Sequence, residues 1–250
     1  MNKWIVAKVT AIKHWTENLF TLHVEAPVSP FMAGQFTKLG FQINNKCIIQ
    51  RAYSFVNAPS DKNLEFYLVT VKGGHLSTYL HGLSIGDQIL IAKDSAGFFV
   101  LHEIPSCNNL WMLATGTAIG PYLSILQEGK DLERFANIVL VHAVRYQQDM
   151  CYLPLMRKLQ HKYREKLYIQ TIVSREKVRG SLLGHIPPLI SNGTLEHSIG
   201  LKIQHQHSHI MLCGNPNMVR STQDVLKNTK NMKKHLRRGP PGHISTEHYW

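Results

Sequence analysis

The stretch "LWMLATGTAIGPYLSILQ", residues 110–127, decides the fold of the second half of the chain. An apolar run at 110–115 leads into a glycine turn, and Pro121 then opens a helical pattern. A strand covered on both faces is apolar throughout, and proline suits the first position of a helix. A glycine turn between a strand and a helix presents free N–H groups to an anion. The stretch therefore predicts one unit of a parallel α/β sheet with a candidate phosphate-binding turn.

The spacing of this turn, G-T-A-I-G-P, differs from the G-x-G-x-x-G dinucleotide fingerprint, so a plain packing turn remains an alternative. The stretch "LCGNPNMV", residues 212–219, repeats the arrangement, with Gly214, then Asn215 as an N-cap and a proline at the first helical position. Cys213 is expected to end its strand at the same sheet edge as Gly116. For this cysteine alone, a buried structural thiol is the simpler interpretation.

From residue 106 onward, apolar runs alternate with helical patterns, which indicates a parallel α/β sheet over 106–250. The expected strands lie at 110–115, 138–145, 167–176 and 209–214, and the expected helices at 121–129, 152–166 and 216–228. The tail, "GPPGHISTEHYW", is too rich in glycine and proline to extend a helix.

Residues 1–101 instead contain short β-branched and aromatic runs separated by Pro, Gly, Asn and Asp. The expected strands lie at 4–12, 19–26, 34–41, 47–56, 64–71 and 88–94, with one short helix at 76–83. Six strands in so short a segment predict a small antiparallel barrel. The expected fold therefore has two domains, an antiparallel β-barrel followed by an α/β parallel-sheet domain.

The composition disfavours several classes of protein. The four cysteines are far apart and lack zinc-site spacing, and a disulfide-stapled secreted scaffold would be smaller and richer in cysteine. The N-terminus, "MNKWIVAKVT", has no long apolar region, so we expect no signal peptide. No stretch reaches the ~20 apolar residues of a membrane span. The simplest interpretation is a soluble cytoplasmic protein with free thiols.

The formal net charge of +12 indicates an acidic partner, which can be a nucleic acid, an anionic membrane, a phosphorylated ligand or an acidic protein. The absence of a long basic stripe interleaved with aromatic residues disfavours nucleic acid. Six of the 28 Lys and Arg residues lie between Lys227 and Arg238. This stretch is a candidate docking face for an acidic protein, although a solvated helix end is the default interpretation.

In the first half, "QRAYSFVNAP", residues 50–59, places a cation, an aromatic ring and a hydroxyl at Arg51, Tyr53 and Ser54 of an expected strand. Taken alone, this pattern is typical of an edge strand with a solvated arginine and a half-buried tyrosine. Its meaning changes with the two motifs that follow it along the chain.

Three motifs, R-A-Y-S, G-T-A-I-G-P and C-G-N-P, stand in an order that resembles the ferredoxin–NADP reductase superfamily. The stretches "AGQFTKLG", "VSRE" and the terminal "EHYW" are similar to those of its bacterial ferredoxin/flavodoxin–NADP reductases. The resemblance runs over essentially the whole chain. It implies an FAD-binding barrel followed by an NADP-binding α/β domain whose C-terminal tail returns to the flavin.

The resemblance also implies roles for the residues around FAD. Arg51 would neutralise the pyrophosphate, because a guanidinium matches phosphate geometry. Tyr53 would stack on the isoalloxazine ring, Ser54 would hydrogen-bond near its reactive N5, and Tyr249 would cover the opposite face. The implied FAD contacts are Arg51, Ala52, Tyr53, Ser54, Tyr67, Leu68, Val69, His75, Leu76, Ser77, Thr117, Glu247, Tyr249 and Trp250.

A preference for NADP needs cations for the 2′-phosphate, and Arg145 and Arg175 end the second and third α/β strands. The bacterial subgroup resembled here carries a further arginine in a segment that reads "GSLLGHIP" in this chain, so His185 is a departure that weakens the contact. For either arginine alone, a surface role is an open alternative. The implied NADP contacts are Gly116, Thr117, Arg145, Arg175, His185, Cys213, Gly214 and Asn215.

The implied activity is an FAD-dependent oxidoreductase that moves electrons between NADPH and flavodoxin or ferredoxin, by hydride transfer at flavin N5 followed by single-electron steps. Ser54, Cys213 and Tyr249 are the implied catalytic residues. The expected partner is an acidic electron-carrier protein. We expect no metal, no nucleic acid and no membrane, and a monomer.

Two other functions remain open at this point. A flavin reductase or NAD(P)H diaphorase, which reduces free flavins or quinones, would use the same motifs. A nucleotide-sensing subunit would hold FAD without turnover, although Ser54, Cys213 and Tyr249 argue against it.

Overall fold

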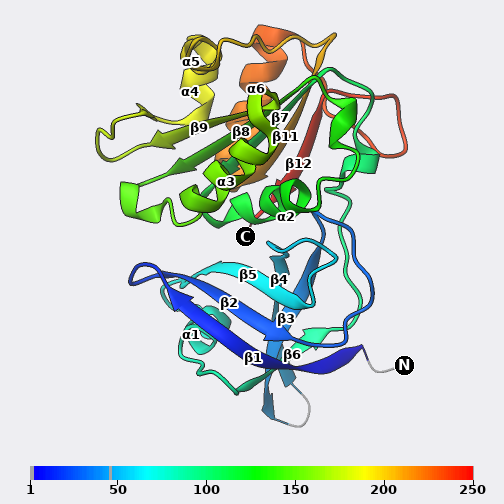
Figure 1. Cartoon of the computed structure of the whole chain (residues 1–250), viewed down its shortest axis with the longest axis vertical. Helices are drawn as coiled ribbons and strands as arrows, with labels where there is room; N and C mark the ends of the chain where they lie inside the picture. The colour runs from blue at the N-terminus through cyan, green and yellow to red at the C-terminus, as the bar shows by residue number, and fades with distance from the viewer. Residues whose placement is uncertain (1–2, 45–46, 250) are drawn as a thin grey trace. The chain divides into compact units, whose positions relative to one another are not determined.

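The computed structural model describes residues 3–44 and 47–249 of the chain. These residues form two compact units, and each is described by itself (Figure 1). The first unit comprises residues up to 100 together with 120–129, and the second comprises 101–119 and the residues from 130 onward. The helix α2 (Gly120–Glu128) therefore packs with the first unit, although it continues the chain of the second.

The first unit is a six-stranded antiparallel sheet with the strand order β4-β3-β6-β1-β2-β5. The two end strands, β4 and β5, meet at a bridge between Phe55 and Phe66, which closes the sheet into a barrel. The elements are β1 (Trp4–His14), β2 (Leu19–Glu25), β3 (Phe36–Asn44), β4 (Cys47–Ser54), β5 (Asn63–Val69), α1 (His75–His81) and β6 (Gln88–Ala92).

The barrel core follows from the two-residue period of its strands. Phe20 pairs with Leu68 and Leu22 pairs with Phe66 across β2 and β5, and all four side chains are buried. The helix α1 adds its buried leucines to the same cluster. Alternate residues of each strand face this core, which is the pattern expected of a sheet with one solvated face.

The second unit is a six-stranded sheet, order β10-β9-β8-β7-β11-β12, in which every neighbouring pair is parallel. Its strands are β7 (Asn109–Thr115), β8 (Asn137–Val144), β9 (Leu167–Val173), β10 (Ser181–Leu183), β11 (Ser208–Gly214) and β12 (Ile244–His248). Its α-helices are α3 (Leu153–Tyr163), α4 (Ile186–Ser191), α5 (Thr194–Ile199) and α6 (Pro216–Lys230). The short 3-10 turns are η1 (Leu101–Glu103), η2 (Gly116–Ile119), η3 (Leu132–Arg134), η4 (Gln147–Asp149) and η5 (Arg164–Lys166).

Helices cover both faces of this parallel sheet. The helix α3 lies on one face, and α4, α5 and α6 lie on the other (Figure 1). Leu113, Val141 and Leu212 from the central strands pack with α4, α5 and α6 in one buried cluster. The near-continuous apolar strands arise because both faces are covered, so the predicted fold class is confirmed.

Two strands of this sheet are missing from the sequence-based prediction. The strand β12 lies in the glycine- and proline-rich tail and pairs with β11, with Thr246 opposite Leu212 and Glu247 opposite Cys213. Its sequence, "ISTEH", has one large apolar residue, because β12 is an end strand and needs little burial. The strand β10 has only three residues, which is too short to leave a periodic signal.

The basic stretch from Lys227 to Arg238 lies at the amino-terminal edge of the second sheet. The helix α6 begins after the carboxyl end of β11 and runs back, and Lys234 bridges to Ile244 at the start of β12. This edge is opposite to the one that carries Gly116 and Gly214. Two of its six cations form ion pairs, Lys230 with Glu196 and Arg237 with Glu103.

Within the described residues, the structure contains no helix with both the length and the apolar character needed to cross a membrane.

The ion pair between Lys230 and Glu196 generates a stability prediction. Glu196 is buried, and its carboxylate accepts hydrogen bonds from the Lys230 ammonium at 2.6 Å and the Ile203 N–H at 2.7 Å. Lys230→Met leaves the buried carboxylate without its cation and should lower the free energy of unfolding by ~3 kcal/mol in denaturant titration. Lys227→Met, an exposed position on the same helix, is the matched control and should change little. Equal stability of the two variants would contradict the prediction.

Candidate functional site

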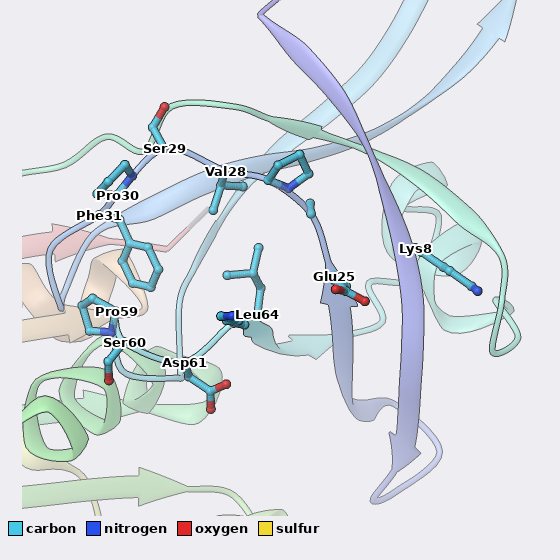
Figure 2. Close-up of a pocket in the computed structure, with 13 residues that line it drawn as sticks. Lys8, Glu25, Val28, Ser29, Pro30, Phe31, Pro59, Ser60, Asp61 and Leu64 are labelled. Carbon is cyan, nitrogen blue, oxygen red and sulfur yellow. The ribbon is translucent and has the colours of Figure 1, made fainter.

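A hollow on the surface of the first unit is not the predicted site. It has a volume of about 650 Å³ and is walled by the loop residues 26–31 and 59–62, with Pro30, Phe31 and Pro59 on one side (Figure 2). None of the residues implied to bind FAD lines it. Its two lysines are balanced by one glutamate and one aspartate, so the hollow offers no net charge to a pyrophosphate.

The end strands of the barrel supply a better cofactor site. Beyond the Phe55–Phe66 bridge, β4 and β5 each present an edge whose backbone groups are not engaged by a neighbouring strand of the sheet order. Residues 51–54 lie at the end of β4 and residues 67–69 lie at the end of β5, and we call the space between these two strand edges the barrel opening. Tyr67 and Leu68 are buried and Val69 is half-buried, so a ligand there would meet apolar surface.

The R-A-Y-S segment brings a cation, a ring and a hydroxyl to this opening. Arg51 is exposed, its guanidinium donates to the Gln50 carbonyl oxygen at 2.7 Å, and it pairs with no carboxylate among the described residues. Burial raises the pKa of Tyr53 to about 12, against the opposing effect of Arg51, so the phenol is neutral. Ser54 is buried at the end of the strand. Ala52 is exposed between them.

The loop before α1 leads into His75, Leu76 and Ser77, three of the residues implied to contact FAD. The Ser77 hydroxyl accepts a hydrogen bond from the Val71 N–H at 3.0 Å and donates to the Gly74 carbonyl oxygen at 3.3 Å. This side chain therefore shapes the loop. The first N–H groups of α1, from His75 and Leu76, have no partner within the helix and are the groups that an anion would meet.

The glycine turn contributes to the first unit through the start of α2. A Cβ at Gly120 would lie 3.3 Å from Val56 Cγ2 and 4.0 Å from the carbonyl oxygens of Ser54 and Phe55. The Ser124 hydroxyl donates to the Asn57 carbonyl oxygen at 2.6 Å. The helix α2 therefore holds the chain directly after the R-A-Y-S segment, and the second glycine of the turn permits the close approach.

In the second unit, the carboxyl ends of the parallel strands gather the other predicted residues. Gly116 and Thr117 follow β7, and Cys213 and Gly214 end β11. The Asn215 N–H donates to the Thr115 hydroxyl oxygen at 3.0 Å, and a Cβ at Gly214 would collide with that hydroxyl. Gly214 also has a φ of 134°, so glycine is required there.

A row of small and polar side chains crosses the sheet one residue before this edge. Residues paired in register on neighbouring strands point to the same face. The row reads Glu247, Cys213, Ala114, His142, Thr171 and Ser181, from β12 to β10. It lies on the face opposite Leu113, Val141 and Leu212.

Cys213 is a fully buried thiol within this row. Burial raises its pKa well above the ordinary value, and the nearby Glu247 carboxylate raises it further. The thiol is therefore protonated at neutral pH, and it serves as a small apolar contact and weak donor rather than as a nucleophile.

Two hydrogen bonds, one between backbone groups and one to a side chain, join the two arginine-bearing loops. The Arg175 N–H donates to the Arg145 carbonyl oxygen at 3.0 Å, and the Glu176 carboxylate accepts from the Gln147 N–H at 2.6 Å. Arg145 and Arg175 are both exposed and form no ion pair among the described residues. His185 is exposed just after β10, at the same edge of the sheet. This pair of cations can bind a phosphate group.

Among the C-terminal residues, Glu247 lies within β12 and Tyr249 directly follows this strand. The Tyr249 N–H donates to the Gly214 carbonyl oxygen at 3.0 Å, so the tail is fixed to the same edge as the glycine turn. Trp250 lies outside the described residues, and its implied contact with FAD stays a prediction.

Sequence reasoning missed three residues that shape this edge: Thr115, His142 and Glu176. His142 is fully buried in β8, and its Nε2 lies 2.9 Å from the Gly116 carbonyl oxygen. A histidine inside the apolar run "IVLVHAV" was the available signal. Thr115 and Glu176 stand beside predicted residues, but their roles depend on strand pairing.

The structure shows no group of three or more His, Cys, Asp or Glu side chains able to hold a metal ion within residues 3–44 and 47–249.

Comparison with known proteins matches each half of the chain to a family. Residues 4–98 match the family model of an oxidoreductase FAD-binding domain, and residues 112–224 match an oxidoreductase NAD-binding domain. The chain is 60% identical to a flavodoxin/ferredoxin–NADP reductase of Escherichia coli K12 and 58% identical to one of Buchnera aphidicola subsp. Baizongia pistaciae, and both alignments cover 100% of each chain. A solved ferredoxin NADP+ reductase of Neisseria gonorrhoeae, with bound FAD and NADP, is 31% identical over 100% of both chains, with a TM-score of 0.93.

The fold and these matches define an oxidoreductase with an FAD-binding domain followed by an NAD-binding domain. Within that class, the chain belongs to the flavodoxin/ferredoxin–NADP reductase family. The predictions of family, fold class and enzyme class, and of FAD and NADP as cofactors, are confirmed.

The buried histidine of the row leads to a pH prediction. Burial lowers the pKa of His142 from 6.5 to about 4, although its hydrogen bond to Gly116 acts in the opposite sense. Between pH 6.5 and about 4, the His142 imidazole is protonated in the unfolded chain and neutral in the folded chain. The free energy of unfolding therefore falls as the pH falls. The loss reaches up to about 3 kcal/mol for this one group.

Urea titration across that pH range measures the effect. His142→Leu should show a shallower loss of stability with falling pH than the unsubstituted protein. His161→Leu, at an exposed position of α3, is the control and should keep the original slope. An unchanged slope in His142→Leu would contradict a neutral buried imidazole.

Proposed function

We propose that this chain moves electrons between NADPH and flavodoxin or ferredoxin through a bound FAD. Residues 1–101 form the FAD-binding domain, and residues 106–250 form the NADP-binding domain with a tail that returns to the flavin. The observation that carries the proposal is the pair of exposed arginines, Arg145 and Arg175, fixed beside each other at the sheet edge that ends in the glycine turn.

The barrel opening supports FAD binding. Arg51 offers an exposed guanidinium for the pyrophosphate, and the N–H groups of His75, Leu76 and Ser77 offer a second anion site. Tyr53 presents a neutral ring for stacking on the isoalloxazine. When bound, FAD supplies the conversion between two-electron and one-electron transfer. Ala52, Ser54, Tyr67, Leu68, Val69, Thr117, Glu247, Tyr249 and Trp250 complete the proposed contacts.

The sheet edge supports NADPH binding. Gly116, Thr117, Gly214 and Asn215 offer backbone groups at two strand–helix turns, and Arg145 and Arg175 offer charge for the 2′-phosphate. His185 completes the proposed contacts with one imidazole instead of a guanidinium.

Three side chains are proposed to act at the reacting atoms. Ser54 is a buried hydroxyl that can hydrogen-bond the flavin near N5, and Cys213 is a neutral thiol that shapes the nicotinamide site without adding charge. Tyr249 is held by the Gly214 carbonyl through its backbone, so its ring can move while its anchor stays.

The partner is proposed to be an acidic electron carrier, since the net charge of +12 would speed its encounter. The proposed site of action is the cytoplasm, and the proposed form is a monomer that binds neither nucleic acid nor membranes.

The first test is anaerobic. The purified protein is expected to be yellow, and its visible flavin absorbance should bleach rapidly with NADPH and slowly with NADH. Oxidised flavodoxin added next should become reduced. Arg145→Ala with Arg175→Ala should remove the preference for NADPH over NADH and leave the flavin content unchanged. Protein without flavin would overturn the proposal. Bleaching without transfer to flavodoxin would favour the free-flavin reductase, and colour that never bleaches would favour the sensor.

The histidine at position 185 generates a further prediction. His185→Arg places a permanent guanidinium at the sheet edge and should lower the dissociation constant of NADP+ by about tenfold, with NAD+ binding unchanged. Isothermal titration calorimetry on the flavin-loaded protein measures both. His197→Arg, exposed on α5, adds the same charge elsewhere and is the control. Equal gains from both variants would show that net charge, not position, governs affinity.

A further inference from the structure

His142 is the one histidine in the polar row of the second sheet, and it occupies the middle of that row. It pairs in register with Ala114 on one side and Thr171 on the other. Its side chain is completely buried. Because its partner in the row is the small Ala114, the ring has room to lean along β7 and reach the Gly116 carbonyl oxygen, two residues further on, at 2.9 Å.

The chemistry of this contact fixes the state of the ring. A carbonyl oxygen only accepts, so Nε2 must carry the proton. Nδ1 is buried and has no hydrogen-bond partner among the described residues. Burial lowers the pKa of His142 to about 4, so the ring is neutral at physiological pH. His142 is thus a single, directed hydrogen-bond donor.

The direction of this hydrogen bond determines which backbone group of the glycine turn faces a ligand. The peptide bond between Gly116 and Thr117 is planar and trans, so its C=O and N–H point in opposite directions. A carbonyl held inward by His142 turns the Thr117 N–H away from the buried ring. Thr117 is the second residue of η2, and the first N–H groups of a helix have no partner within it.

Burying an imidazole is less favourable for stability than burying an apolar side chain. An unpartnered ring nitrogen in a dry interior costs free energy that an apolar side chain of similar size would not. Gly116 has a φ of 55°, and a Cβ built there would meet nothing within 4 Å. Contacts on the Cβ side of Gly116 therefore do not hold the turn, whereas the hydrogen bond from His142 acts on the Gly116 carbonyl directly.

We propose that His142 is a positioning residue for the nicotinamide nucleotide, which holds the Gly116 carbonyl inward and so presents the Thr117 N–H to the ligand. This inference rests on the proposed NADP site and adds a residue to it. His142 acts through the turn and does not touch the nucleotide.

Equilibrium binding tests the proposal directly. The probe is NADP+, titrated calorimetrically into the flavin-loaded protein. His142→Leu removes the donor and should raise the dissociation constant by about tenfold, the worth of one hydrogen bond. His142→Gln keeps an N–H donor near the position of Nε2 and should bind within about threefold of the unsubstituted protein.

His209 provides a matched control. It is a second buried histidine of the same sheet, near the amino end of β11, and its Nε2 lies 2.9 Å from the Ser245 hydroxyl. His209→Leu should lower the melting temperature as His142→Leu does, but it should leave NADP+ binding unchanged. Equal weakening in both leucine variants would show a general packing effect and overturn the positioning role.

Nuclear magnetic resonance on the unsubstituted protein keeps the test independent of whether the variants fold. The imidazole ¹⁵N shifts of His142 should report the Nε2–H tautomer, and the Thr117 amide signal should move when NADP+ is added. Observation of the Nδ1–H tautomer, or of a Thr117 amide signal that does not move when NADP+ is added, would overturn the proposal. Failure of the unsubstituted protein to bind NADP+ at all would instead overturn the proposed function, and this inference with it.

Discussion

The approach of β7 to β11 at their carboxyl ends is the constraint on which the rest of the second unit depends. The Asn215 N–H donates to the Thr115 hydroxyl, and only glycine at 214 leaves room for that hydroxyl. The bond ties the two strand–helix turns together, and the Tyr249 N–H adds β12 through the Gly214 carbonyl. One hydroxyl and one missing side chain therefore set the spacing of the edge where the nucleotide is proposed to bind.

Side-chain hydrogen bonds then orient what the strands position. The buried His142 donates to the Gly116 carbonyl of the first turn, and the exposed Glu176 carboxylate accepts from the Gln147 N–H between the arginine-bearing loops. Burying His142 costs desolvation, which its hydrogen bond partly offsets. The edge is therefore preorganised by the protein, which reduces the ordering that a bound nucleotide would otherwise impose.

Much of this arrangement could be predicted from sequence, and the rest fails for physical reasons. The apolar run at 110–115 and its glycine turn are local signals, so β7 and the turn that follows it were expected. The strand β12 has no such signal, because an end strand with one apolar residue is stabilised by pairing with β11. His142 depends on register with Ala114, a long-range property that a local pattern does not contain. The same limit applies to Glu176.

The proposed preference for NADP over NAD rests on geometry as well as on charge. A backbone hydrogen bond joins the two loops that carry Arg145 and Arg175, and a dianionic 2′-phosphate bound by both guanidiniums would relieve their mutual repulsion. A third arginine at 185 would add attraction and also add repulsion in the absence of ligand. In the proposed site, His185 would remove part of the attraction and part of the repulsion, so the net loss of affinity would be smaller than the loss of one full charge contact. Preorganisation of the Arg145 and Arg175 loops limits the loss further, because their backbones are already placed before the nucleotide arrives.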